Sequence, residues 1–187
     1  MQKRFKDLLL ATKRPGIESL VTWLENKTDF FKAPASTQYH DSQTEGLLKH
    51  SLDVYDRMTS LASLYIHDIP AESFPVSALL HDICKANFYK EDSRNVKENG
   101  VWKSVPFYSV DDKIPLGHGE KSVILIQHHM RLTLQEIMAI RWHMGMWGIS
   151  DYGTQKALSA ALDAYPIITL LHSADLASAY LDKWRQL

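Results

Sequence analysis

The sequence has 187 residues, of which 45% are hydrophobic and 23% are charged. This composition is typical of a globular protein, and we expect one domain over residues 1–187. The single cysteine, Cys84, excludes an intramolecular disulfide and a metal cluster built from cysteines. The net charge of −1 provides no general basic field for binding nucleic acid or an anionic membrane.

No apolar run approaches the roughly 18 residues that a membrane-spanning helix needs. The run Leu8-Leu9-Leu10-Ala11 is too short for the apolar region of a signal peptide. We therefore expect a cytoplasmic protein without a membrane partner. The unusual feature is the presence of nine histidines, and their positions carry the functional interpretation.

Residues 1–40 are predicted to form a helical extension that packs on the core. Apolar residues recur at helical spacing from Phe5 to Leu9 and from Ile17 to Leu24, with Pro15-Gly16 as a break. The sequence Ser42-Gln-Thr-Glu45 has the form of a capping box, which predicts that the third helix opens there.

The fourth helix is predicted to start at Ser73-Phe-Pro75, with the serine as its cap and the proline in its first turn. Its apolar pattern continues toward Tyr89, which places His81 and Asp82 on the helix. Asn99-Gly100 is the strongest short hairpin signal, and Val101–Val105 has strand composition.

We therefore expect a β-hairpin at about residues 91–110, inserted between helices. Because it leaves the His81 helix and returns at the predicted loop that contains His118, it should lie at the rim of any site that they form. A second capping box, Thr133-Leu-Gln-Glu136, opens a helix that extends to about His143. Further helices are predicted over 123–130, 154–164 and 167–184. The predicted fold class is all-α, a helical bundle with one small hairpin.

Four histidines and two aspartates fall among core positions of separate predicted elements. They are His50, His81, Asp82, His118, His143 and Asp175. Buried ionisable groups are costly unless they are paired or bind a metal ion. Nitrogen and oxygen ligands without thiolate suit Mn, Fe, Co, Ni, Zn or Mg. Adjacent helical residues diverge by about 100°, so His81 and Asp82 reach one ion only if it lies against the helix between them.

The order His…His-Asp…His…His…Asp resembles that of the HD superfamily of metal-dependent phosphohydrolases. Five segments carry the resemblance over about residues 40–180: Gly46-Leu-Leu-Lys-His-Ser-Leu-Asp-Val54, Leu79-Leu-His-Asp-Ile-Cys-Lys85, Leu116-Gly-His-Gly-Glu-Lys-Ser122, Ile140-Arg-Trp-His-Met-Gly145 and His172-Ser-Ala-Asp-Leu-Ala-Ser178. The resemblance implies an HD-type helical bundle that hydrolyses a nucleotide or a related phosphoester. One departure is Cys84, where the family often has glycine, but no ligand is lost.

The resemblance also implies roles for individual residues. Two divalent ions are favoured over one, with His50, His81, Asp82 and Asp175 at the first, His118 and His143 at the second, and Asp82 between them. Asp82 and Lys85 would be catalytic, since Asp82 can orient a metal-bound water and Lys85 can contact the phosphate or the leaving group. Lys121, Arg141 and His40 are weaker candidates for binding the substrate.

Other interpretations stay open at this point. A few relatives with this six-ligand set are di-iron oxygenases, and a ligand-binding module without turnover would also need the same pocket. The near-neutral charge argues against an RNA-degrading role. Trp102, Trp142 and Trp147 fit packing in the core or at a rim better than stacking on a base. His172 fits a structural or exposed position.

Overall fold

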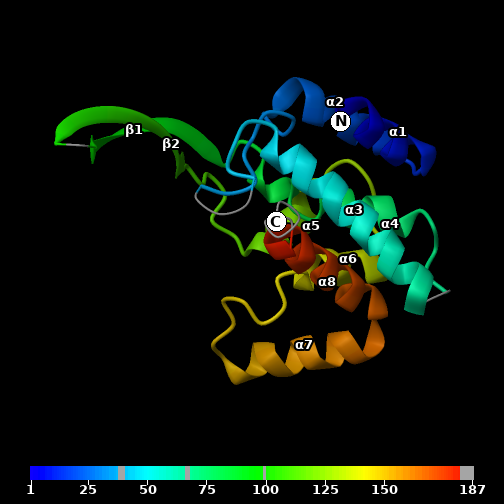
Figure 1. Ribbon diagram of the computed structural model, residues 1–187. Helices are drawn as coiled ribbons and strands as arrows, with labels where there is room; N and C mark the ends of the chain where they lie inside the picture. Colours follow the sequence, from blue (N-terminus) through cyan, green and yellow to red (C-terminus); the bar gives the residue numbers. More distant parts are fainter. Residues whose placement is uncertain (38–40, 66–67, 99, 182–187) are drawn as a thin grey trace.

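The computed structural model describes residues 1–37, 41–65, 68–98 and 100–181, which form a helical body with one projecting hairpin (Figure 1). The elements in these residues are α1 (Gln2–Ala11), α2 (Ile17–Lys27), α3 (Gly46–Tyr65), α4 (Ser73–Leu80), the short 3-10 helix η1 (Ile83–Lys85), β1 (Tyr89–Glu98), β2 (Val101–Val110), α5 (His118–Gln127), α6 (Leu134–Trp142), α7 (Tyr152–Ala164) and α8 (Pro166–Leu181). The mostly helical architecture with one hairpin agrees with the sequence prediction. No helix in the described ranges is both long enough and apolar enough to cross a membrane.

One buried cluster joins the two N-terminal helices to the rest of the body. Phe5 of α1 packs against Phe30 with ring centroids 5.1 Å apart, and both side chains are fully buried. The cluster continues through Leu20 of α2 to Leu47 of α3 and Leu79 of α4. The N-terminal helices are therefore part of the main core.

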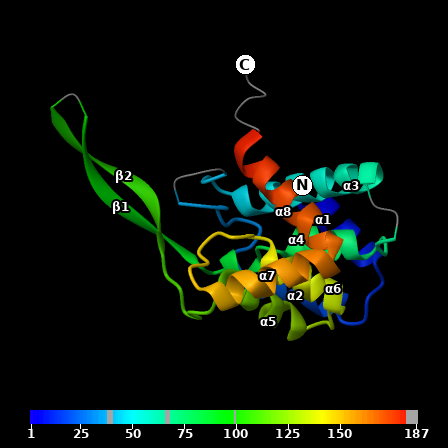
Figure 2. The ribbon, with the colours of Figure 1, turned by 90° about the horizontal axis from the view of Figure 1, so that it is seen from below.

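A second buried cluster lies where α3, α4, α6 and α8 meet. It contains Val54, Ala78, Ala139 and Leu171, one residue from each of these helices. The helices α3 and α8 run close together along this cluster (Figure 2). The same four helices carry or adjoin most of the candidate metal ligands, so their packing decides where those ligands lie.

The structure corrects the predicted start of the third helix. The helix α3 begins at Gly46, and Glu45 has a φ of 63°, which is left-handed rather than helical. The predicted capping box that starts at Ser42 was therefore wrong. The backbone N–H of Glu45 instead donates to the carbonyl oxygen of Lys32 at 3.1 Å, which ties the start of α3 to the segment after α2.

The second predicted capping box is confirmed, and it belongs to a buried polar network. The Thr133 hydroxyl accepts a hydrogen bond from the Glu136 N–H, and the Glu136 carboxylate accepts one from the Thr133 N–H. Glu136 also accepts hydrogen bonds from Arg14 at 2.8 Å and from the Ser73 hydroxyl at 2.9 Å. Ser73 thus lies inside α4 and bonds to Glu136 instead of capping its own helix as predicted.

We expect Glu136→Ala to lower the free energy of unfolding by about 3–5 kcal/mol, because it leaves a partly buried Arg14 charge without its carboxylate. Urea denaturation followed by circular dichroism measures the change. Glu98→Ala is the matched control, since Glu98 pairs with Lys103 on an exposed hairpin surface and should change stability by less than about 1 kcal/mol. Equal effects of the two substitutions would contradict a structural role for the Glu136 network.

The hairpin is a two-stranded antiparallel sheet that starts two residues before the predicted boundary. Its register runs from Tyr89 opposite Val110 to Glu98 opposite Val101. Both figures show it projecting away from the helical body, joined to it at the base (Figures 1 and 2). Only the base of the hairpin is therefore placed to contribute to a site in the body.

Candidate metal centre

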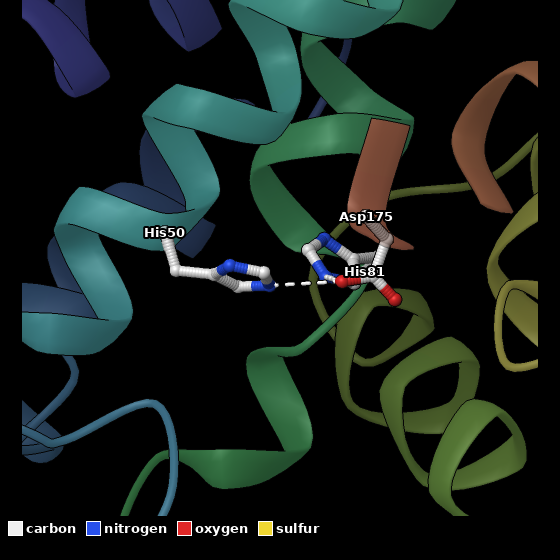
Figure 3. A group of neighbouring side chains, drawn as sticks. All are labelled: His50, His81 and Asp175. Atoms are coloured by element: carbon white, nitrogen blue, oxygen red, sulfur yellow. Dashed lines mark ion pairs between the residues drawn. The ribbon is translucent and has the colours of Figure 1, made fainter. Parts of the chain in front are cut away.

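Four histidines and two aspartates that are distant in sequence converge in the interior. His50 comes from α3, His81 and Asp82 follow α4, His118 starts α5, His143 follows α6, and Asp175 lies on α8. Figure 3 shows His50, His81 and Asp175 pointing toward one another from three separate segments. His50, His81, Asp82 and His143 are almost completely buried.

The two carboxylates lie among the histidine rings. The Nε2 atom of His50 lies 3.1 Å from Oδ1 of Asp175, and the Nε2 atom of His81 lies 3.9 Å from the same oxygen. Asp82 faces the remaining rings, with Oδ1 at 2.6 Å from Nε2 of His118 and 3.5 Å from Nε2 of His143. Its Oδ2 atom lies 3.5 Å from Nε2 of His81. Asp82 therefore lies next to His81 on one side and next to His118 and His143 on the other.

A break after α4 lets His81 and Asp82 face the same site. The helix ends at Leu80, and Asp82 leaves the helical conformation with φ −103° and ψ 18° before η1 begins. The expectation that both residues lie on one helix that continues toward Tyr89 was therefore wrong. Because the chain turns between them, the 100° divergence of neighbouring helical side chains does not apply.

Backbone carbonyls hold two of the rings from behind. The Nδ1 atom of His81 donates to the carbonyl oxygen of Ala78 at 2.8 Å, and Nδ1 of His143 donates to that of Ile140 at 2.7 Å. A carbonyl oxygen can only accept, so each Nδ1 carries the hydrogen and each Nε2 presents a lone pair to the site. The Ser178 hydroxyl contacts His50 in the same way, at 3.2 Å from its Nδ1 atom. The sequence had not indicated Ser178 as part of the site.

This arrangement could hold a metal ion. Nε2 of His81 is buried and makes no hydrogen bond within the part of the chain that the structure describes. Its neighbours are carboxylate oxygens, so acceptor atoms face acceptor atoms, an arrangement that a shared cation stabilises. Three overlapping groups could hold an ion: His50, His81 and Asp175; His81, Asp82 and His143; and Asp82, Cys84 and His118.

The thiol of Cys84 was not expected near the ligands. It is buried, with Sγ at 3.4 and 3.5 Å from the two ring nitrogens of His118. Nearly equal distances to both nitrogens place the sulfur against the ring. The backbone N–H of Cys84 donates to the Ser122 hydroxyl at 3.3 Å, which joins η1 to α5.

Gly119 allows His118 to approach His143. A Cβ atom at position 119 would collide with the carbonyl oxygens of Ile140 and Arg141 at the end of α6. The absence of a side chain therefore lets the start of α5 approach the end of α6, where the two rings lie 5.5 Å apart between centroids.

Burial and neighbouring charges shift the pKa values of Asp82, His118 and His143. Burial opposes ionisation of Asp82, but the Lys85 ammonium and the His118 ring outweigh it and hold the Asp82 pKa well below its usual range. Burial also opposes the charge of His118, yet Asp82 and Cys84 raise the His118 pKa to about 10. For His143, burial dominates and lowers the pKa.

A cavity of about 550 Å³ opens onto the site. It is lined by Ala35, Ser36, Asp82, Lys85, Tyr89, His118, His143, Met144, Met146, Trp147, His172, Asp175, Leu176, Ala179 and Tyr180. Among the described residues of the hairpin, Tyr89 at the base of β1 is the one that lines the cavity. The expectation that the hairpin lies at the rim therefore holds for its base, while its distal strands project away (Figure 2).

The expected substrate-binding cations lie in different places. Lys85 lines the cavity, with Nζ 2.6 Å from Oδ2 of Asp82. Lys121 is buried and paired with Asp112, and Arg141 is paired with Glu120 at 2.7 Å. Neither lines the cavity, so the structure does not bring them to the site as predicted. His40 lies outside the described residues.

Comparisons with protein-family models, with curated proteins and with solved structures found no match. The interpretation of the site therefore depends on its own geometry and on the resemblance noted in the sequence.

Metal binding should release a proton from His118. With a pKa of about 10, this ring is protonated at neutral pH, and a metal ion that takes its Nε2 lone pair must displace the proton. The apparent affinity should therefore rise with pH up to about pH 10. Titration calorimetry with Mn²⁺ at pH 7.5, in buffers of different ionisation enthalpy, should report about one proton released per His118 bound.

Two variants test this assignment of the proton. His118→Asn should abolish the buffer dependence, because the protonated ring is gone. His143→Asn should retain it, because the lowered pKa of His143 leaves that ring neutral at neutral pH. Identical binding heats in all buffers for the unmodified protein would contradict the prediction.

Proposed function

We propose that the protein is a divalent-metal-dependent phosphohydrolase, a phosphomonoesterase or phosphodiesterase that acts on a nucleotide or a related phosphoester. The observation that carries the proposal is the convergence of four imidazoles and two carboxylates at the floor of a cavity, with the buried Nε2 atom of His81 facing carboxylate oxygens. The resemblance of the ordered residues to the HD superfamily supports the same function.

The resemblance implies the ligand assignment, and the contacts support it. His50, His81 and Asp175 would hold one ion, and His118 and His143 a second; His50 lies 3.1 Å from Asp175, and His118 and His143 lie 2.6 and 3.5 Å from Asp82. Asp82 would serve both, since its two oxygens face different rings. When bound, the ions would neutralise the phosphate oxygens and lower the pKa of a bound water so that it can attack phosphorus.

The protein's own contribution is to bind and orient. Lys85 is the cationic side chain at the cavity wall among the described lining residues, and it would contact the phosphate or the leaving oxygen. Asp82 holds Lys85 in that position by their 2.6 Å ion pair. The carbonyls of Ala78 and Ile140 keep the imidazoles aimed at the site while the substrate binds.

Replacement of His81 tests the proposal directly. His81→Ala should lower turnover of phosphoesters by at least ~100-fold, because even residues that only support metal ligands contribute 10- to 100-fold. The assay uses mono- and diesters with Mn²⁺, Co²⁺, Ni²⁺ and Mg²⁺, together with metal content by mass spectrometry. His128→Ala, at an exposed histidine outside the cavity lining, is the matched control and should retain full activity.

The outcomes separate the alternatives. Unchanged turnover in a folded His81→Ala protein would reject the proposal. Tightly bound iron with oxygen consumption, and no phosphoester turnover, would favour the oxygenase. A ligand that copurifies without turnover under any metal would favour a binding module.

Lys85→Gln should reduce turnover by about 10²-fold, as expected when one preorganised cation is lost from a transition state. Metal content should stay unchanged, because Lys85 is not among the candidate ligands. Measuring both quantities separates a role toward the phosphate from a role in metal binding. Loss of metal in parallel with activity would instead assign Lys85 to the support of Asp82.

A further inference from the structure

The cavity above the candidate metal centre has a largely apolar wall. Besides the ligands and Lys85, its lining includes Tyr89, Met144, Met146, Trp147, Leu176 and Tyr180. Trp147 is 77% exposed and Tyr180 is 53% exposed. Large apolar side chains grouped and exposed beside a polar site mark a binding surface.

The charges at the cavity limit what this wall can accept. Among the described lining residues, Lys85 is the one lysine or arginine, and Asp82 already pairs with it. The nearby cations Lys121 and Arg141 are held by acidic partners outside the cavity. Further phosphate groups, away from the candidate ions, would need such cations to neutralise them.

His172 adds one polar contact to the apolar wall. Its Nδ1 atom donates to the carbonyl oxygen of His143 at 2.6 Å, so Nδ1 carries the ring hydrogen. In the uncharged tautomer that this bond selects, Nε2 is the acceptor. Gly145, with a φ of 59°, lies against this ring, and a Cβ atom there would come within 2.8 Å of it. The ring is thus held in place beside the cavity.

We infer that the site takes a phosphomonoester with a single phosphate group, whose alcohol carries a flat aromatic group that packs against Trp147. This inference rests on the proposed function. The phosphate lies at the candidate metal centre and Lys85, and the aromatic group lies on the apolar wall. A nucleoside monophosphate has this chemistry, whereas a triphosphate carries charge that the described wall does not neutralise.

The reaction balances as a simple hydrolysis. The oxygen of water forms a bond to phosphorus, and the bond between phosphorus and the alcohol oxygen breaks. One water proton goes to the alcohol oxygen, which leaves as the free alcohol, and the products are the alcohol and inorganic phosphate.

The test compares adenosine monophosphate, adenosine triphosphate and glycerol phosphate with saturating Mn²⁺. We expect kcat/KM for the monophosphate to exceed that for each of the other two by at least ~10-fold. Glycerol phosphate lacks the base, whose stacking on an aromatic side chain contributes roughly 5- to 100-fold, and the triphosphate carries further phosphate groups that find no lysine or arginine besides Lys85 among the described lining residues. Trp147→Ala should raise KM for adenosine monophosphate by roughly 5-fold or more while leaving glycerol phosphate unchanged. Because Trp147 is exposed, this variant should fold normally.

Trp102→Ala is the matched control. Trp102 is 67% exposed on β2 and does not line the cavity, so both substrates should react as with the unmodified protein. Equal or faster hydrolysis of the triphosphate would overturn the inference. An equal effect of Trp147→Ala on adenosine monophosphate and glycerol phosphate would also overturn it.

Equilibrium binding separates this inference from the proposed function. Calorimetry with Mn²⁺ should give tighter binding of adenosine monophosphate than of the triphosphate, and Trp147→Ala should weaken the former. If that pattern appears without turnover, the ligand class stands and the phosphohydrolase proposal fails. If turnover appears with a preference for the triphosphate, the phosphohydrolase proposal stands and the ligand class fails.

Discussion

The burial of two carboxylates among four imidazoles is the constraint on which the site depends. Such a group is unfavourable unless positive charge lies within it or beside it. In the protein alone, that charge comes from the Lys85 ammonium and from the His118 ring, which its raised pKa keeps protonated at neutral pH. A divalent ion would provide it more effectively, because it binds several lone pairs at once. The backbone carbonyls behind His81 and His143 prevent those rings from turning away to find other donors.

The helical body holds this group through ordinary packing. The apolar cluster between α3, α4, α6 and α8 places His50 opposite Asp175. The end of α4 at Leu80 lets the chain turn, which directs Asp82 toward the same point. Gly119 then permits α5 to approach α6 closely enough for His118 to reach Asp82. Each of these features acts locally, but the site forms only because all of them bring the ligands to one point. The buried Glu136 network, which ties Arg14 to α4 and α6, stabilises two of these helices from outside the site.

The cavity combines a charged floor with an apolar wall, and this contrast is the basis for the proposed substrate. The cations that the sequence suggested for phosphate binding differ in availability: Lys85 lies at the wall, whereas Lys121 and Arg141 are engaged elsewhere. Neutralisation of a phosphate would therefore depend mainly on bound metal and Lys85. The exposed Trp147, for which the sequence favours packing in the core or at a rim, lines the cavity where the rest of a substrate would extend.

The sequence by itself determined the helical character, the hairpin, the Thr133 capping box and the six residues that meet in the interior, because helical periodicity, turn residues and capping pairs are local properties. Other features depended on contacts between distant segments. The left-handed Glu45 and the bond from Ser73 to Glu136 replaced two local capping patterns. Three further features have no local signal in the sequence. They are the turn of the chain between His81 and Asp82, the contact of Cys84 with His118, and the placement of Ser178, His172 and Trp147 around the site. Only the tertiary structure decided them, since packing energy between helices outweighs the small preferences that a short segment has alone.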